Sequence, residues 1–155
     1  MSADAKIAEL GLVLPDPGTP PPARRNAVRT GNLLYTSGAG PVTRPDGTRL
    51  QGKVGRDLTV EEGYQAARET ALVLLAVIRN ELGSLDRVAR VVKVLGMVNV
   101  APGFNKTPDV MNGFSELFYE VFGPEVGPHA RSAVGVAELP IDFPVEIEVI
   151  LEIRD

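Results

Sequence analysis

The sequence contains no cysteine among its 155 residues and only one histidine, His129. Disulfides, thiolate nucleophiles and cysteine-ligated metals are therefore excluded, and a multi-histidine zinc site cannot form within one chain. An excess of basic residues is also missing, because 16 Lys and Arg stand against 20 Asp and Glu. The net charge of −4 gives no overall basic footprint for nucleic acid or an anionic membrane, so neither is expected as a partner.

Long hydrophobic runs are absent as well. The most apolar stretch, residues 71–78, is far too short to span a bilayer. The first residues, MSADAKIAELGLVLP, place Asp and Glu within a short amphipathic stretch, whereas a secretory signal has a basic start followed by an apolar run. We therefore expect a cytoplasmic protein.

The length and composition indicate one domain. With 44% hydrophobic and 23% charged residues, the chain can bury one core but is too short for two ordinary domains. We expect a single domain over residues 1–155, in which residues 1–23 form an N-terminal extension. Residues 3–12 favour one or two helical turns, and the Pro-rich loop PDPGTPPPA at residues 15–23 breaks regular structure.

Two long helices are predicted from apolar periodicity and from their end signals. Apolar side chains recur at helical spacing over residues 60–82, Thr and Glu within residues 59–62 have the spacing of a capping box, and Gly83 is placed for a stop. A second helix is predicted to begin at Thr107-Pro108, as a cap followed by Pro, and to end at Gly-Pro in residues 123–124.

Strand patterns fill most of the remaining chain. Residues 28–37 predict a β-hairpin around a Gly-Asn turn, and residues 50–54 a short edge strand. Further strands are expected at residues 87–100, 130–139 and 145–153. The strand at 87–100 has apolar side chains on both of its expected faces, which are Val92, Val94, Val98 and Val100 on one and Val91, Lys93, Leu95 and Met97 on the other.

This order of elements predicts an α+β two-layer sandwich, in which a mixed sheet carries two helices on one face. Because the central strand is apolar on both faces, the second face also needs a cover. The chain does not obviously supply one, so a partner subunit is the economical expectation.

Three local features could carry chemistry. Arg131, at the start of a strand, could offer a planar fork to a carboxylate, or could be an ordinary surface arginine. Glu146 lies on the polar face of the last strand, where a solvated carboxylate is the simpler interpretation. The glycine-rich loop after Ser37 suits either close approach of a ligand or turn geometry. For His129, packing or orientation is favoured over catalysis, since no Ser-His-Asp motif surrounds it.

Taken together, these segments resemble one family. The hairpin RTGNLLYTSGAGPV, the helix segment VMNGF, the strand ARSAVGVAELP and the terminal VEIEVILEI are similar to the Rid/YjgF (reactive intermediate deaminase) superfamily, also named endoribonuclease L-PSP. The resemblance covers nearly the whole domain, and ARSAVGVAELP followed by VEIE is its specific part. It implies a chorismate-mutase-like fold and a homotrimeric barrel with small-molecule sites between subunits.

The resemblance also implies an activity and a set of site residues. Members of the best-understood branch hydrolyse enamine and imine intermediates, such as 2-aminoacrylate and 2-imino acids, to 2-keto acids and ammonia without a cofactor or metal. The carboxylate-binding Arg of the family falls on Arg131 and its water-positioning Glu on Glu146, and the spacing between the two fits without a gap. The family's Ser-Gly pair falls on Ser37 and Gly38, and its helix Asn on Asn112.

Two positions depart from the family pattern. A family Cys is replaced by Ala133, and an aromatic expected near the first strand falls around Arg24. These changes indicate a divergent branch with a modified pocket. A deaminase hydrolase is the first hypothesis for function, a non-catalytic or regulatory trimer that binds small carboxylates is the second, and a ribonuclease or translation inhibitor is the third.

Overall fold

The computed structural model describes residues 2–154, which fold as one mixed five-stranded sheet with helices on one face. The sheet order is β1-β2-β5-β3-β4, and only the β3–β4 pair is parallel. The strands are β1 (Ala27–Thr30), β2 (Leu33–Thr36), β3 (Val88–Asn99), β4 (Ala130–Val136) and β5 (Val145–Ile153). The helices are α1 (Ala3–Glu9), α2 (Val60–Leu82) and α3 (Thr107–Val126), with short 3-10 turns η1 (Leu85–Arg87) and η2 (Pro140–Asp142).

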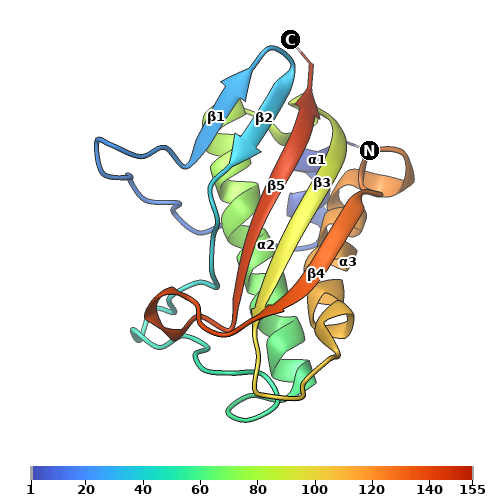
Figure 1. Cartoon of the computed structure of the whole chain (residues 1–155). Coiled ribbons are helices and arrows are strands. Elements are labelled where there is room, and N and C mark those ends of the chain that lie inside the picture. The colour runs from blue at the N-terminus through green and yellow to red at the C-terminus, as the bar shows by residue number, and fades with distance from the viewer. Residues whose placement is uncertain (1, 155) are drawn as a thin grey trace.

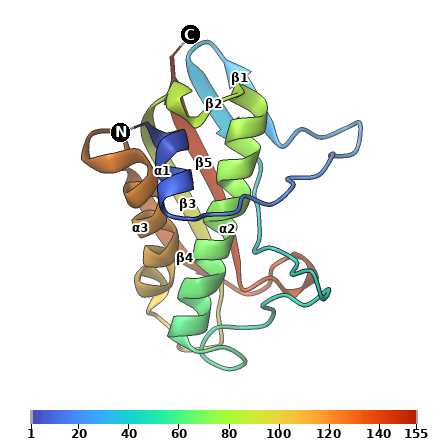
Figure 2. The same ribbon diagram turned by 180° about the vertical axis from the view of Figure 1, so that it is seen from behind.

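Figures 1 and 2 show that α1, α2 and α3 all lie on the same side of the sheet, so no helix of residues 2–154 covers the other face. The predicted α+β fold with its mixed sheet is therefore confirmed, with α1 as a third helix beside the two long ones. This helix contacts α3 and is held at its start, where the backbone N–H of Ala3 donates to Asp86 at 2.6 Å. No helix within residues 2–154 is both long and apolar enough to cross a membrane.

The ends of α2 are those that its sequence predicts. The hydroxyl of Thr59 accepts from the N–H of Glu62 at 3.1 Å, and the Glu62 carboxylate accepts from the N–H of Thr59 at 2.8 Å. Gly83 ends the helix in the left-handed region with φ 80°, which glycine adopts without the steric cost that a Cβ brings.

The start of α3 differs from the prediction. Lys106 occupies the cap position without a side-chain hydrogen bond, and Thr107 is already helical. The Thr107 hydroxyl instead donates to the carbonyl of Ala133 on β4 at 2.9 Å, which joins the start of the helix to the sheet. The helix changes direction at Gly123, whose φ of 75° is not helical, so the predicted Gly-Pro stop ends its regular part.

A register shift alters the predicted faces of β3. The pairing with β5 is irregular between Val88 and Arg90 and again between Val91 and Lys93. Such a bulge inserts an unpaired residue and reverses the alternation of side chains beyond it. As a result Val91 and Val94 are both buried, whereas Val92 is 36% exposed. The prediction that Val92 shares a face with Val94 is therefore wrong.

Two strand boundaries are also corrected. Residues 50–54 form no strand, because Gly52 has φ 108° and only Val54 makes isolated bridges. The strand predicted over residues 130–139 ends at Val136. The next carbonyl, that of Ala137, accepts a hydrogen bond from the ammonium of Lys53 and is thereby withdrawn from the ladder.

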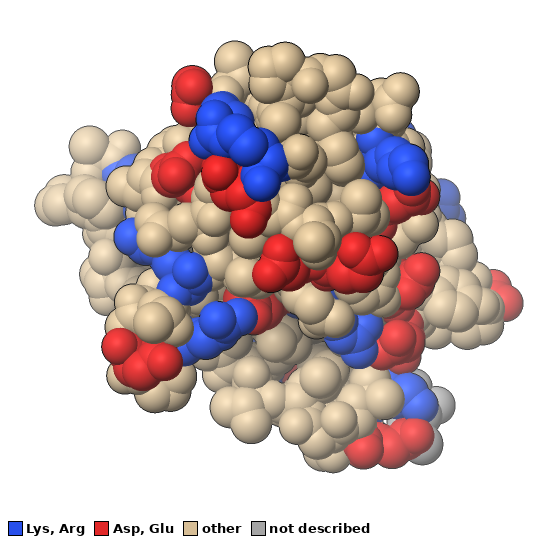
Figure 3. Space-filling view, turned by 90° about the horizontal axis from the view of Figure 1, so that it is seen from below, with Lys and Arg blue, Asp and Glu red and all other residues tan. Residues whose placement is uncertain are grey.

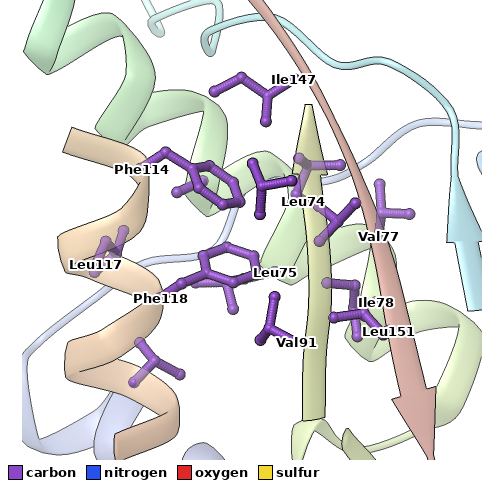
Figure 4. Packing of buried hydrophobic residues seen from close by; sticks show 14 of the residues in the cluster. Leu74, Leu75, Val77, Ile78, Val91, Phe114, Leu117, Phe118, Ile147 and Leu151 are labelled. Carbon is purple, nitrogen blue, oxygen red and sulfur yellow. The ribbon is translucent and has the colours of Figure 1, made fainter. Parts of the chain in front are cut away.

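The core lies between the sheet and the two long helices. Figure 4 shows Phe114 and Phe118 of α3 beside leucines of α2, facing the strands. The two rings stack with centroids 4.1 Å apart, and both are fully buried. The helices approach closely at Gly113, where a Cβ atom would collide with the backbone carbonyl oxygen of Tyr64 on α2.

We predict that Gly113→Ala destabilises the fold, because a backbone oxygen cannot turn away as a side chain can. The expected loss is about 1–3 kcal/mol, the usual cost of overpacking, even though Ala favours helix more than Gly does. Urea unfolding measures this change. Gly63→Ala is the matched control, since its Cβ would meet side-chain methyl groups and no backbone atom, the nearest being a Val110 methyl group at 3.1 Å. An equal loss in both variants would contradict the interpretation.

Candidate functional site

Arg131 lies on the helix side of the sheet. Its partner in the parallel ladder is Val94, which is fully buried beneath the helices. The guanidinium therefore reaches α3, where Nη1 donates to the amide oxygen of Asn112 at 3.0 Å and to the hydroxyl of Ser115 at 3.1 Å. Asn112 and Ser115 are three positions apart on one helix and so share a face.

This arrangement leaves part of the guanidinium available. Its Nη1 atom has two hydrogens, and Asn112 and Ser115 accept both. Among the described residues, the Nη2 atom makes only a long contact of 3.5 Å, to the carbonyl of Pro108. The edge formed by Nη2 and Nε is therefore the one that can bind a carboxylate through two parallel hydrogen bonds.

His129 extends the network behind Arg131. Its Nδ1 atom lies 2.7 Å from the carbonyl oxygen of Gly127, and its Nε2 atom lies 3.0 Å from the Ser115 hydroxyl. A carbonyl can only accept, so Nδ1 carries the proton, and Nε2 of the neutral ring accepts from Ser115. The edge of Phe114 packs against the ring at a centroid distance of 6.3 Å. These are the orienting and packing contacts that the sequence favoured.

Burial lowers the pKa of His129 below its ordinary value of 6.5, and the positive charge of Arg131 lowers it further. The hydrogen bond to Gly127 opposes this shift. The imidazole is therefore neutral at pH 7. Together with Ser115 and Arg131 it lines an open pocket of about 490 Å³, whose other walls include Tyr119 and Pro128.

Glu146 occupies the opposite face of the sheet. It alternates along β5 with Val145 and Ile147, which are fully buried under the helices, and it pairs across the ladder with Met97. Gly38 lies directly against it, since a Cβ at Gly38 would overlap the Glu146 carboxylate. The glycine after β2 is thus explained by close approach of a side chain of the same protein.

Ser37, Gly38 and Arg24 line a second pocket, of about 430 Å³. Its walls also include Pro15 and Pro17 of the N-terminal extension. The Ser37 hydroxyl donates to the carbonyl of Arg25 at 2.6 Å, which holds the end of β2 against the chain that leads into β1.

The residues predicted from sequence therefore form two groups within one chain. Arg131 and Asn112 meet on the helix side, where Ala133 also lies, opposite the buried Gly96 of β3. Glu146, on β5, adjoins Gly38, which follows Ser37. Figure 1 shows that β4 and β5 flank β3 on opposite sides. The central Arg–Glu pair is not brought together.

Comparison with known proteins identifies the family. Residues 5–150 match the profile of a family described as YjgF/chorismate mutase-like. The same description names endoribonuclease as an unproven activity of the family. The chain belongs to this YjgF family. It is 42% identical over 151 residues to Protein TCP17 of Trypanosoma cruzi, covering 97% of this chain and 94% of that protein.

Solved structures share the fold to different extents. Protein Atu1372 of Agrobacterium tumefaciens, described as of unknown function, superposes with a TM-score of 0.86 at 38% identity and covers 97% of this chain and 91% of its own. The YjgF protein of Escherichia coli gives a TM-score of 0.56 at 25% identity, over 83% of this chain and 87% of its own.

Sequence reasoning missed Ser115 as a site residue. The available signal was its place three residues after Asn112 on a predicted helix, which puts both side chains on one face. Nothing in the local sequence joins Ser115 to His129, because the turn at Gly123 brings them together. Within residues 2–154, no three acidic or histidine side chains are grouped so as to hold a metal ion.

We predict that the ring of His129 titrates below pH 6.5 and that Arg131→Met raises its pKa. Removing the cation makes the imidazolium less unfavourable, while burial, the larger cause, still holds the pKa below 6.5. NMR titration measures this directly, because the chain has a single histidine. Arg44→Met, which removes a cation paired with Glu69, is the control and should leave the titration unchanged. A lower pKa in Arg131→Met would contradict the electrostatic explanation.

Proposed function

We propose that the protein is a homotrimeric, cofactor-free deaminase that hydrolyses 2-imino acids, including the imine of 2-aminoacrylate, to 2-keto acids and ammonia. The observation that carries this proposal is the oriented guanidinium of Arg131. Asn112 and Ser115 fix its Nη1 end, so that the opposite edge faces a small carboxylate with little loss of side-chain freedom on binding.

The two separate groups of residues support an assembly of several copies. Arg131 and Glu146 lie on opposite faces of the sheet, so a substrate can touch both only if a second chain supplies one of them. The face without helices carries exposed apolar side chains, with Val28 at 54%, Tyr35 at 42% and Val134 at 44% exposure. A surface of this kind is normally covered by a partner, and a ring of three copies closes a cyclic assembly.

In the proposed reaction Arg131 binds the substrate carboxylate, and Glu146 of a neighbouring copy orients a water molecule toward the imine carbon. The water oxygen bonds to that carbon while Glu146 takes a proton. Glu146 returns that proton to the imine nitrogen, which gives a neutral carbinolamine. The hydroxyl proton of the carbinolamine then passes through Glu146 to the nitrogen as the C–N bond breaks, so that ammonia leaves and the 2-keto acid forms. Backbone groups at Ser37 and Gly38, next to Glu146, would line the pocket.

A carboxylate-binding trimer without catalysis is the second candidate. The replacements at Ala133 and Arg24 favour it, because both fall at positions where the resemblance expects site residues. A ribonuclease is supported less well. Figure 3 shows acidic and basic side chains interspersed on the end of the molecule that it presents, whereas an RNA-binding groove requires clustered positive charge.

The trimer is testable by light scattering in solution, where we expect three times the mass of the chain. Val134→Asp should shift the protein toward monomer, because a charge would be buried in the proposed interface. Val13→Asp changes a residue that is 84% exposed on the N-terminal extension and should leave the trimer intact. A monomer at micromolar concentration in the unmodified protein would overturn the proposal.

Two substitutions separate catalysis from binding. Glu146→Gln should retain 2-ketobutyrate binding but reduce ammonia release from enzymatically generated 2-aminoacrylate by roughly 10²–10⁴-fold, the usual effect of a positioned base. Arg131→Ala should weaken 2-ketobutyrate binding by about 2–4 kcal/mol, measured by calorimetry, because the charged anchor is lost.

Glu152→Gln is the control for the Glu146 variant. Glu152 lies further along the same face of β5 and already accepts from Asn32 at 3.3 Å, so its loss should hardly change the rate. Equal effects of the two glutamine variants would exclude Glu146 as the water-positioning residue. Binding of keto acids without any deaminase activity would favour the second candidate.

A further inference from the structure

Ser115, His129 and Gly127 form a hydrogen-bonded series that the deaminase proposal does not use. The carbonyl of Gly127 orients the ring through Nδ1 at 2.7 Å, and Nε2 lies 3.0 Å from the Ser115 hydroxyl. A nucleophile bonded to a base, with the base oriented by a third group, is the arrangement of nucleophilic catalysis. Both side chains are partly exposed and line the pocket of about 490 Å³.

The direction of each hydrogen bond is fixed by chemistry. Because the proton of the neutral ring is on Nδ1, Nε2 can only accept, and Ser115 must donate its hydroxyl proton to it. One lone pair of the same oxygen accepts from Nη1 of Arg131 at 3.1 Å. The serine is therefore bonded to a base and lies beside a permanent cation, which favours its deprotonation.

We propose that Ser115 is a nucleophile that takes acyl groups from small carboxylic esters, with His129 as its base. This inference does not rest on the deaminase reaction, since it involves neither Glu146 nor a second chain.

The atoms balance without a cofactor. Ser115 Oγ bonds to the ester carbonyl carbon as its proton moves to His129 Nε2, and the carbonyl oxygen becomes an oxyanion. Arg131 Nη1, which no longer donates to the neutral hydroxyl, can donate to that oxyanion. The C–O bond then breaks, and His129 returns the proton to the leaving alcohol. Water hydrolyses the acyl-serine by the same route, releasing the carboxylic acid.

The pocket walls define the substrate class. Tyr119 and Pro128 offer apolar surface to a short acyl chain. The two acidic residues of the wall are engaged, because Glu116 accepts from the hydroxyl of Tyr64 at 2.6 Å and Glu120 pairs with Arg68 at 2.9 Å. The pocket therefore suits a neutral, short-chain ester.

The carbonyl of Gly127, which orients the His129 ring, limits the expected rate of acyl transfer. A carbonyl oxygen orients the ring but stabilises the imidazolium less than the carboxylate of a Ser-His-Asp triad. Acyl transfer should therefore be slow, and stoichiometric labelling of Ser115 is a more sensitive measurement than turnover.

The experiment treats the full-length protein with an alkyl fluorophosphonate and locates the adduct by peptide mass spectrometry. We expect labelling at Ser115, none in Ser115→Ala, and a rate reduced by roughly 10²–10⁴-fold in His129→Gly, the range for a lost general base. Ser132→Ala is the control, because Ser132 accepts from Lys93 at 2.8 Å and contacts no imidazole, and it should label like the unmodified protein.

Two further measurements distinguish a catalytic role of His129 from a role in which its network only positions Arg131. Added imidazole should restore labelling of His129→Gly, and the rate in the unmodified protein should be constant near pH 7 and fall on acidification through the lowered pKa of His129. Absence of labelling, or equal labelling with and without His129, would overturn the proposal. Ammonia release from 2-aminoacrylate tests the deaminase separately, so either activity can be lost while the other remains.

Discussion

The parallel pairing of β3 with β4 is the constraint on which the rest of the site depends. It places Arg131 opposite the buried Val94 and thus on the helix side of the sheet. The antiparallel pairing of β5 with β3 places Glu146 beside Met97, on the face without helices. Because side chains alternate along β3 without a register shift between Val94 and Met97, no rotamer can bring Arg131 and Glu146 together within one chain. A reaction that needs both residues therefore needs two copies of the protein.

Much of the fold could be predicted because its signals are local. The capping box at Thr59 and the glycine stop at Gly83 depend on neighbouring residues alone, and both helix ends match the sequence pattern. The start of α3 was wrong for a non-local reason, since the Thr107 hydroxyl bonds to a carbonyl of β4. The faces of Val91 and Val92 were predicted wrongly, whereas those of residues 93–98 were right. The shift between the two parts is a bulge, which depends on the partner strand and leaves no trace in the periodicity.

The site shows the same division. Arg131 and Asn112 could be named from a family pattern, and their hydrogen bond lies within the structure. The role of the glycine at position 38 could not be decided from sequence, because the atom that excludes a side chain there belongs to Glu146. Ser115 was missed because its partner His129 follows a change of chain direction. When a turn in the backbone brings two residues together, their separation in the sequence does not predict the contact.

The two activities proposed for this pocket use different edges of the same guanidinium. The Nη1 atom faces Asn112 and Ser115, where it stabilises charge on the serine oxygen or on an oxyanion beside it. The Nη2 and Nε edge faces away from these partners and can hold a carboxylate. A planar group with donors on several sides can serve both, which a lysine at this position could not do. The neutral state of His129 is compatible with either role; burial lowers the pKa of the ring, and the positive charge of Arg131 lowers it further. The arginine thus contributes to the protonation state of its neighbour and also stabilises the anion that each proposed reaction forms or binds.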